Sequence, residues 1–229
     1  MKWHYWLLLL ALASGSSRSE QVAVVVSEVW PNATEADGSG FYWDIIRQAF
    51  ASQNITLITD SAPYPRAVHQ VQQWQADAWV GAYVNETDKA IYSRQAIDQD
   101  DIVVIQPIGA RIDLQNGYFS WMRGYEFQRY IDIGKPGYLV SDRRRALHML
   151  RRGRGLSGHI DVLSVLEPLQ QQGELDLTDL EIRPLTTLPL HLGFQMSPRG
   201  KMLRDAFDNG MQTLQHSGEL ERLRHQYDW

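Results

Sequence analysis

The chain has 229 residues, of which 44% are hydrophobic and 21% charged, so it is too apolar for a disordered polymer and long enough for one or two packed cores. Its net charge of −5 at pH 7 argues against a nucleic-acid binder that relies on bulk attraction to phosphates. The absence of cysteine excludes disulfides, thiolate zinc sites, iron–sulfur clusters, a catalytic cysteine and a lipidated N-terminal cysteine.

Residues 1–19 have the pattern of a secretory signal peptide. Lys2 gives a positive start, residues 6–13 form a short apolar run, and small residues follow at 14–17. The apolar run is far shorter than the roughly 20 residues that a membrane-spanning helix needs. We therefore expect an exported, periplasmic protein whose signal peptide is cleaved; a short membrane anchor is the alternative.

Strand and helix patterns alternate along the first half of the chain. Residues 22–26 are a continuous β-branched run, typical of a strand buried on both faces, whereas Phe41, Ile45 and Ala49 recur at helical spacing. This alternation predicts a parallel sheet covered by helices. The expected elements are strands over 22–26, 55–59, 78–82 and 102–105, and helices over 41–50 and 66–75, the second with Ala67, Val71 and Trp74 on one face.

The second half continues with shorter elements. Ser141 and Asp142 are suitable caps for a helix that Gly153 ends, and Gly218 separates two final amphipathic helices. Pro198 suits the first turn of the earlier of these two helices. The expected elements are strands over 138–140 and 160–165 and helices over 143–152, 198–215 and 220–227.

Several short motifs follow one another in a characteristic order. They are Glu28-Val29-Trp30-Pro31, the Gly40–Ile46 stretch that enters a helix, Gln75–Gly81, Tyr92-Ser93, the Leu150–Asp161 stretch, Gly200–Leu203, and Ser217–Leu220 with Tyr227. Their order and spacing over most of the chain after residue 19 resemble the periplasmic solute-binding proteins of family 3. These are amino-acid-type substrate-binding proteins of ABC transporters, with the type II periplasmic binding fold.

The resemblance implies an α/β fold of two lobes, each a mostly parallel sheet covered by helices, joined by two hinge crossings. We place the crossings near 106–111 and 192–196. Lobe one would comprise residues 20–108 and 195–229, and lobe two residues 109–194. A ligand would bind between the lobes, which close by hinge motion, at the carboxyl ends of the strands.

Aromatic side chains at strand ends are the candidates for the walls of this cleft, because they combine an apolar face with a polar rim. For each of them the alternative is packing in the core, and that alternative is strongest for Trp79, which lies inside a strand. Arg66 begins a helix and would either clamp a ligand carboxylate or bond loop carbonyls. The aromatic candidates are Trp30, Tyr64, Trp79 and Tyr83.

Both anchors for an α-amino acid are missing or displaced. The family carries an arginine for the ligand carboxylate in the loop after the third strand, where this chain has Glu86, with Lys89 three residues later as a point-charge substitute. The family's carboxylate for the ligand amine falls near Leu166, with Glu167 one residue beyond. We therefore expect a small polar or aromatic ligand rather than an ordinary amino acid.

Patterns for catalysis and metal binding are lacking. The six histidines after residue 19 have no metal-ligand spacing, and the sequence has no phosphate loop or dinucleotide fingerprint. We expect no cofactor and no metal, and structural roles for Asp77 and Asp161 at the start of strands. The arginines at 143–145, 151, 152 and 154 form a basic patch, either a solvated helix face or a docking surface for an acidic partner.

These observations predict a monomeric, non-catalytic solute-binding protein that closes on a small molecule. Its expected partners are the ligand and either an ABC permease or a membrane sensor, but no nucleic acid. Two alternatives stay open at this point. One is a periplasmic enzyme of the dehydratase type on the same scaffold, and the other is a degenerate family member that acts as an interaction module.

Overall fold

A computed structural model describes residues 21–153 and 155–229. The predicted signal peptide and Arg154 of the basic patch lie outside the described residues. The strands are β1 (Gln21–Ser27), β2 (Ile55–Ser61), β3 (Ala78–Ala82), β4 (Ala90–Tyr92), β5 (Asp98–Pro107), β6 (Phe119–Met122), β7 (Tyr138–Val140), β8 (Gly158–Val162) and β9 (Leu180–Gln195). The helices are α1 (Phe41–Ala51), α2 (Tyr64–Gln72), the 3₁₀ helix η1 (Phe127–Arg129), α3 (Arg143–Arg151), α4 (Leu163–Gln171), α5 (Pro198–Ser217) and α6 (Glu219–Tyr227).

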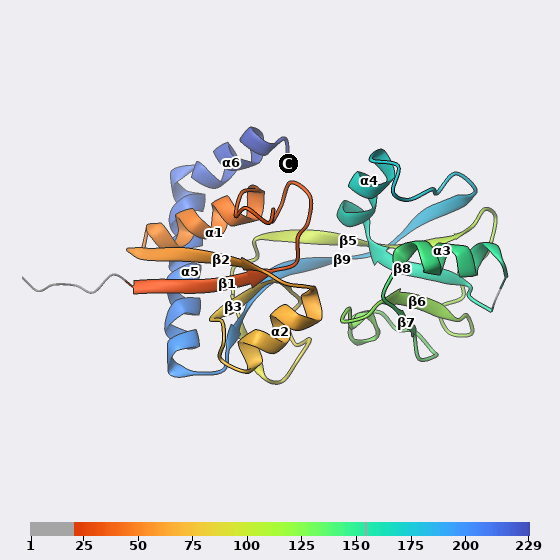
Figure 1. The fold of residues 1–229 in the computed structure, drawn as a ribbon, viewed down its shortest axis with the longest axis horizontal. Helices are drawn as coiled ribbons and strands as arrows, with labels where there is room; N and C mark the ends of the chain where they lie inside the picture. The colour runs from red at the N-terminus through yellow and green to blue at the C-terminus, as the bar shows by residue number, and fades with distance from the viewer. Residues whose placement is uncertain (1–20, 154) are drawn as a thin grey trace, which may run out of the picture.

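The elements form two lobes connected by the long strands β5 and β9 (Figure 1). Lobe one contains β1 to β4, α1, α2, α5 and α6, and lobe two contains β6, β7, β8, α3 and α4. Helices cover the strands in both lobes, which confirms the predicted α/β fold class. Among the residues that the structure describes, no helix is both long and apolar enough to cross a membrane.

Strand β5 pairs antiparallel with β9 along the whole length of β5, from the Asp98–Leu190 pair to the Pro107–Leu180 pair. Residues 102–105 of β5 also pair with β8 of lobe two, and residues 192–194 of β9 pair with β3 of lobe one. The strands therefore pass between the lobes near residues 98–101 and 187–190. The predicted lobe boundaries stay a prediction, and this pairing favours crossings in the first half of β5 and the middle of β9 rather than near 106–111 and 192–196.

A single strand order, β2-β1-β3-β9-β5-β8-β6-β7, runs through both lobes, with β4 added beside β9. The outer pairs β1·β2, β1·β3, β6·β7 and β6·β8 are parallel, as the alternation of strands and helices predicted. The pairs that β9 makes with β3, β4 and β5, and the pair β5·β8, are antiparallel. The antiparallel centre follows from two strands that travel between the lobes in opposite directions.

Strand β9 was not predicted, because Pro184 and Pro189 interrupt its hydrophobic pattern and proline is depleted in strands. The structure accommodates Pro184 at an irregularity. Val103 pairs with Pro184 and Ile102 pairs with Thr186, so the register shifts by one residue at this point. A bulge is one of the few places where a strand tolerates the missing N–H of proline.

Two predicted elements differ from the structure. Helix α2 ends at Gln72, and Trp74 follows it in a left-handed conformation (φ 61°) with 70% of its surface exposed, so Trp74 does not share the buried face of Ala67 and Val71. The strand expected over 160–165 ends at Val162, and Leu163 begins α4. An apolar run by itself does not distinguish the end of a buried strand from the first turn of a helix.

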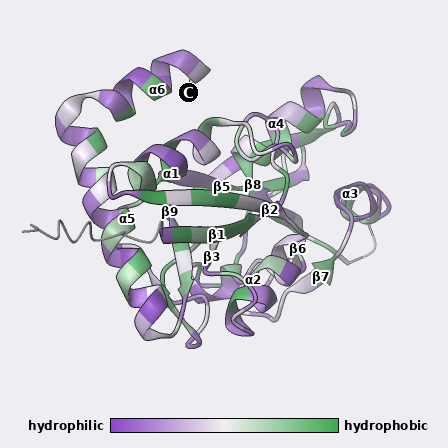
Figure 2. Ribbon diagram, turned by 60° about the vertical axis from the view of Figure 1, so that its left-hand side comes forward, coloured by the Kyte–Doolittle hydropathy of each residue, from purple (hydrophilic) through white to green (hydrophobic). Residues whose placement is uncertain are grey.

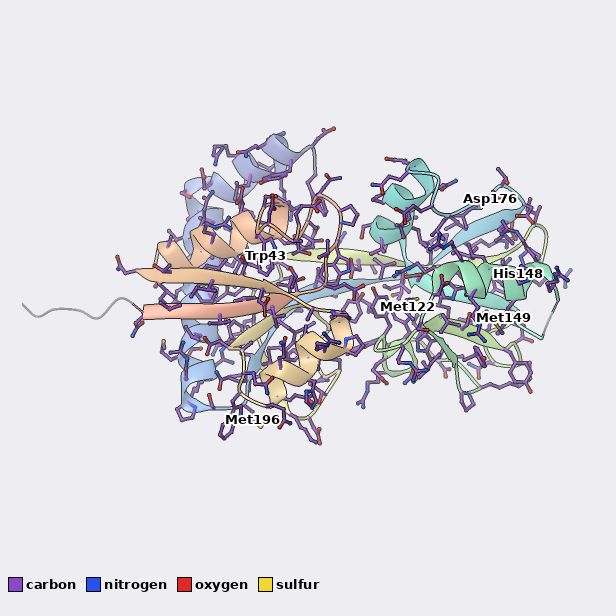
Figure 3. All side chains as sticks on the ribbon, viewed as in Figure 1. Trp43, Met122, His148, Met149, Asp176 and Met196 are labelled. Atoms are coloured by element: carbon purple, nitrogen blue, oxygen red, sulfur yellow. The ribbon has the colours of Figure 1, made fainter. Side chains whose placement is uncertain are left out.

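The largest core cluster fills the space between the sheet of lobe one and helices α1 and α5, and it continues into lobe two through Trp121 and Phe127. Trp43, Phe50 and Phe207 are fully buried there, and Phe50 packs against Phe207 with ring centroids 5.8 Å apart. Figure 3 shows Trp43 on α1 within lobe one. In Figure 2 the strands carry mainly hydrophobic residues, whereas α6 is mostly hydrophilic. The burial of α1 and α5 holds one side of lobe one rigid.

Helices α1 and α5 touch at Gly210, where an added Cβ would overlap the carbonyl oxygen of Ala49. We expect Gly210→Ala to lower the free energy of unfolding by about 1–3 kcal/mol, because the helices must separate, although alanine is the better helix former. Its exposed neighbour Asn209 provides the control, and Asn209→Ala should change stability by less than about 0.5 kcal/mol. Urea unfolding measures both; equal stabilities would show that the helices can separate without cost.

Candidate functional site

A cavity lies between the lobes. Its lobe-one walls follow β1, β3 and α2, and its lobe-two walls come from the loop after β6 and the start of α4. The free space is about 40 Å³, which is room for only a few water molecules. The lining residues are Trp30, Pro31, Ala33, Tyr42, Tyr64, Gly81, Tyr83, Glu86, Asp100, Gly124, Tyr125, Glu126, Val162, Ser164, Val165, Leu190 and Trp229.

Trp30 forms one wall, and its indole packs on Gly81, the next-to-last residue of β3. Gly81 has φ 91°, a conformation that glycine adopts without strain, and a Cβ at this position would overlap the Trp30 indole. The indole lies 6.3 Å from the ring of Tyr64, measured between centroids. Its Nε1 is buried and has no hydrogen-bond partner in the described structure. This N–H is a free donor at the cavity wall.

Glu86 is buried at the cavity, with 9% of its surface exposed. Its Oε2 accepts hydrogen bonds from the Tyr64 hydroxyl (2.8 Å) and from the backbone N–H of Tyr83 (3.1 Å). Burial raises the pKa of Glu86 to about 7, because these hydrogen bonds offset only part of the cost of desolvating the charge. The Tyr64 hydroxyl also lies 2.9 Å from the carbonyl oxygen of Gly81. It has one proton and can donate to only one of these two oxygens at a time. Both contacts are hydrogen bonds only when Glu86 is protonated and donates to the Tyr64 hydroxyl, which then donates to Gly81.

Asp100, on β5, is the second buried carboxyl at the cavity, with 7% of its surface exposed. Its Oδ2 accepts a hydrogen bond of 2.7 Å from the Tyr83 hydroxyl. Burial, together with the neighbouring carboxylates of Asp98 and Asp101, raises the pKa of Asp100 to about 7. Tyr83 therefore connects the two carboxyls, Glu86 through its backbone N–H and Asp100 through its hydroxyl.

Lobe two contacts lobe one closely at Gly124. A Cβ on Gly124 would lie 2.8 Å from Cγ of Pro65 at the start of α2, and Gly124 has φ 99°. The next residue, Tyr125, meets Tyr64 edge to face with centroids 5.9 Å apart. Arg143 donates to the Tyr125 hydroxyl at 3.4 Å from within lobe two. Aromatic rings of both lobes thus meet across the cavity.

Trp229 covers the side of the cavity nearest α6. Its ring packs on Phe41 (4.8 Å between centroids) and meets Tyr42 edge to face (5.2 Å). Its Nε1 donates to Asp98, which also accepts a 3.0 Å hydrogen bond from the Tyr42 hydroxyl. The residues after α6 therefore contribute directly to the cavity wall.

The predicted ligand-binding residues separate into two sets. Trp30, Tyr64 and Tyr83 line the cavity together, and their contact with a ligand stays a prediction. Arg66 and Lys89 are exposed and do not line it, so neither is placed to clamp a carboxylate in this conformation. Both follow the strand-end residues closely in sequence, but their long side chains point to solvent rather than into the cleft.

Trp79 takes the packing role that was the alternative for it. It is fully buried in a core cluster of lobe one, and it lies against Gly193 of β9, where a Cβ would overlap its ring. Its Nε1 donates to the Tyr64 hydroxyl at 3.3 Å. Trp79 thus supports Tyr64 from behind instead of facing the cavity.

The two positions of the displaced amino-acid anchors have different surroundings. Glu86, where the family's arginine would stand, faces the cavity as an acid. Leu166 is buried in the core of lobe two and Glu167 is exposed, so neither supplies the second anchor. Ser164 and Val165, in the first turn of α4, line the cavity instead.

Lobe two contains a buried chain of hydrogen bonds that the sequence did not reveal. Ser120 Oγ lies 2.9 Å from Nδ1 of His159, and His159 Nε2 lies 3.0 Å from Oδ2 of Asp161. The order Ser-His-Asp is that of a nucleophilic triad, but all three residues are fully buried, so a substrate has no path to Ser120. The arrangement serves the packing of β6 against β8.

Figure 3 places His148, which belongs to α3, at the outer end of lobe two.

The arginines of α3 do not form one solvated patch. Arg143 is only 13% exposed and forms a bidentate ion pair with Asp161, Nε to Oδ2 at 2.7 Å and Nη2 to Oδ1 at 3.1 Å. Arg151 pairs with Asp179 at 2.6 Å. Asp77 accepts hydrogen bonds from Val24 N, Gln195 and Arg199, which confirms a structural role for this aspartate.

The sequence matches no protein family model and no curated protein. Solved structures are similar in fold. A histidine kinase sensor domain with similarity to periplasmic binding proteins superposes with a TM-score of 0.73 at 14% identity, over 92% of this chain and 97% of that one. The substrate-binding protein of an amino acid ABC transporter gives 0.67 at 14% identity, over 90% and 98%.

A third structure, a substrate-binding protein of an ABC uptake transporter from Streptococcus pneumoniae with bound histidine, gives a TM-score of 0.69 at 15% identity, over 90% of this chain and 92% of that one. Identities this low establish the fold alone. The chain has the two-lobed fold of periplasmic binding proteins, and its cavity lies between the lobes of that fold.

Proposed function

We propose that this protein is an exported, family 3-type solute-binding protein that closes its lobes on a small organic molecule and presents it to an ABC permease or a membrane sensor. The observation that carries the proposal is the convergence of Trp30, Tyr64 and Tyr83 from lobe one with Tyr125 from lobe two on one cavity. Proteins of similar fold are described as amino-acid-binding, and one as a sensor domain. No catalytic step is part of the proposal.

The small free volume supports hinge closure as the working motion. About 40 Å³ is too little for a solute with several heavy atoms, and the walls belong to two lobes that only β5 and β9 connect. Opening at these strands would enlarge the cavity and separate the contacts between lobes, such as that of Tyr83 with Phe127. Gly124, packed against Pro65, would then be a contact that forms on closure.

Ligand binding should change the tryptophan fluorescence through Trp30 and Trp229, which line the cavity. A thermal-shift screen of the purified protein against amines, amino acids, organic acids and small aromatics identifies the ligand. A ligand at 100 times its Kd adds about 2.7 kcal/mol to the free energy of unfolding, which raises Tm by several degrees. Trp30→Phe should remove a large part of the fluorescence response to that ligand. Trp74→Phe, which changes an exposed tryptophan outside the cavity, should retain it. No shift with any compound class would contradict the proposal.

Transport and sensing can be separated once a ligand is found. Cells that lack the protein should lose high-affinity uptake of that compound if the partner is a permease. If uptake continues and only the transcriptional response to the compound is lost, the partner is a sensor. The sensor reading has its own support, because the histidine kinase sensor domain superposes with a TM-score of 0.73.

A further inference from the structure

We propose that the cavity selects a small organic cation that has no carboxylate, such as an alkylamine or a quaternary ammonium. The inference rests on the proposed function, since it takes the cavity between the lobes as the ligand site. It adds the charge class of the ligand, which neither the fold nor the structural relatives supply. The argument comes from the charges at the cavity, the pairing of the nearest cations and the aromatic walls.

Every charged side chain that lines the cavity is acidic. Glu86 and Asp100 are buried, and Glu126 lies at the edge with 38% of its side chain exposed. No lysine or arginine is among the lining residues. A ligand carboxylate would therefore be repelled by two buried acids, with no guanidinium in the lining to neutralise their charge. A ligand cation would instead form an ion pair with acids that have no cationic partner in the protein.

Three arginines beside the cavity are already paired with carboxylates, whereas Arg66 and Arg123 are exposed and do not line it. Arg143 binds Asp161 at 2.7 Å, Arg224 lies 3.5 Å from Asp98, and Arg129 lies 3.9 Å from Glu126. Recruiting any of them to a ligand carboxylate would leave its own acid without a partner. Glu86 and Asp100, in contrast, accept hydrogen bonds from tyrosines and make no ion pair within the described residues.

The remaining walls suit a cation as well. Electron-rich faces of tryptophan and tyrosine attract ammonium groups, most strongly where water is excluded. Rings of this kind come from both lobes, so closure would surround the ligand. They are Trp30, Tyr42, Tyr64, Tyr83, Tyr125 and Trp229.

The groups that face the two acids predict how binding depends on pH. Glu86 faces Tyr64 of α2, Tyr83, Tyr92 of β4, Tyr130 and Glu126. Asp100 faces Tyr83, Tyr42 of α1, Tyr125, its strand neighbours Asp98 and Asp101, and Asp161 of β8. The facing groups are thus neutral tyrosines and further acids. The cations beside them, Arg129, Arg143 and Arg224, are paired with Glu126, Asp161 and Asp98 respectively. A bound cation would favour the ionised acids, so cation binding should release protons and strengthen as the pH rises from 6 to 8.

The test uses four compounds with one carbon skeleton and different charges: n-butylamine, 4-aminobutanoate, butanoate and butanamide, with choline as the quaternary ammonium. Affinities are measured by calorimetry at pH 6 and pH 8, in buffers with different ionisation enthalpies, so that proton release is read directly. We expect n-butylamine or choline to bind at least tenfold more tightly than the zwitterion, the anion and the amide, with proton release at pH 6 to 7.

Variants connect the selectivity to the two acids. Glu86→Gln and Asp100→Asn should each weaken cation binding at least tenfold and reduce proton release. Glu174→Gln removes the same charge from an exposed site on lobe two, away from the cavity lining, and should bind the cation as the wild type does. Thermal unfolding of each variant shows that the fold is retained.

The outcomes separate this inference from the proposed function. Tighter binding of butanoate than of n-butylamine would place an anion in the cavity, for example at the N-terminus of α4, and would overturn the cation inference while leaving a solute-binding protein. Preference for 4-aminobutanoate would do the same and return the ligand to the amino acids. Absence of binding by these probes and by all classes of the thermal-shift screen would overturn both.

Discussion

Glu86→Gln and Asp100→Asn should make the protein more stable above pH 7, by up to a few kcal/mol each, while they abolish tight binding. Both acids are buried without a cation, and their pKa values rise from 4.5 and 3.8 to about 7. A carboxyl with a higher pKa in the folded protein binds its proton more tightly there. The stability that it contributes is therefore present at low pH and is lost as the pH rises from about 4 to about 7.

Urea unfolding at pH 5 and pH 8 measures this effect. The wild type should lose stability relative to the double variant Glu86→Gln/Asp100→Asn over this interval, and the difference should level off above pH 8. Glu174→Gln, with an exposed acid replaced, should follow the wild type at both values. Parallel stabilities of wild type and double variant from pH 5 to pH 8 would show that neither acid is raised in pKa. Buried acids kept for binding at the expense of stability are the usual pattern of a functional site.

Arg143→Met should destabilise the protein by about 3–5 kcal/mol, the typical effect of removing one partner from a buried ion pair. Asp161 is fully buried, and without Arg143 its charge would keep only the bonds to His159 and to the N–H of Val162. Burial would by itself raise the pKa of Asp161, but Arg143 and the His159 hydrogen bond lower it below its ordinary value. In the variant this pKa should rise, so the loss of stability should shrink as the pH falls.

Two further variants test whether the effect of Arg143→Met comes from the unpaired charge of Asp161. Arg143→Met/Asp161→Asn removes the orphaned charge and should recover most of the lost stability. Arg145→Met, on the exposed face of the same helix, should lower the free energy of unfolding by less than about 0.5 kcal/mol. If the Arg143 and Arg145 variants unfold at the same urea concentration, the ion pair has no net role. Weaker ligand binding in the double variant, at near wild-type stability, would show that Arg143 also positions Tyr125.

Local patterns account for the elements that were correctly predicted. The β-branched run of β1, the helical spacing of Phe41 and Ile45 in α1 and the cap Asp142 of α3 depend on neighbouring residues, and the structure shows each where it was expected. The cap is direct, since Asp142 accepts a hydrogen bond from Arg144 N. The two-lobed fold came from the order of motifs along the whole chain. Strand β9 and the start of α4 were missed because prolines or an apolar run made the pattern ambiguous, and the short strands β4 and β6 were not predicted either.

The candidate site was only partly visible in the sequence. Trp30, Tyr64 and Tyr83 lie at strand ends, and the rule that ligands bind at this edge of a sheet found them. Arg66 was suggested by its place at the start of a helix, and Lys89 by the position of the family's arginine. Sequence position does not show on which side of a helix start or loop a long side chain emerges. Glu86 was noticed only as a departure from a pattern, although an acid among aromatic residues after a buried strand was already a signal.

The sequence by itself determined the alternation of strands and helices and the aromatic edge of the sheet, because these depend on periodicity and local position. The two lobes were implied by the resemblance of the motif order to a known family. Only the tertiary structure decided the charge of the cavity. Asp100 comes from a strand that connects the lobes, Tyr125 from lobe two and Trp229 from beyond the last helix, so no local pattern links them to Glu86. The shared property of these residues, burial around two unpaired acids, exists only once the lobes meet, because desolvation depends on what covers a side chain and not on its neighbours in sequence.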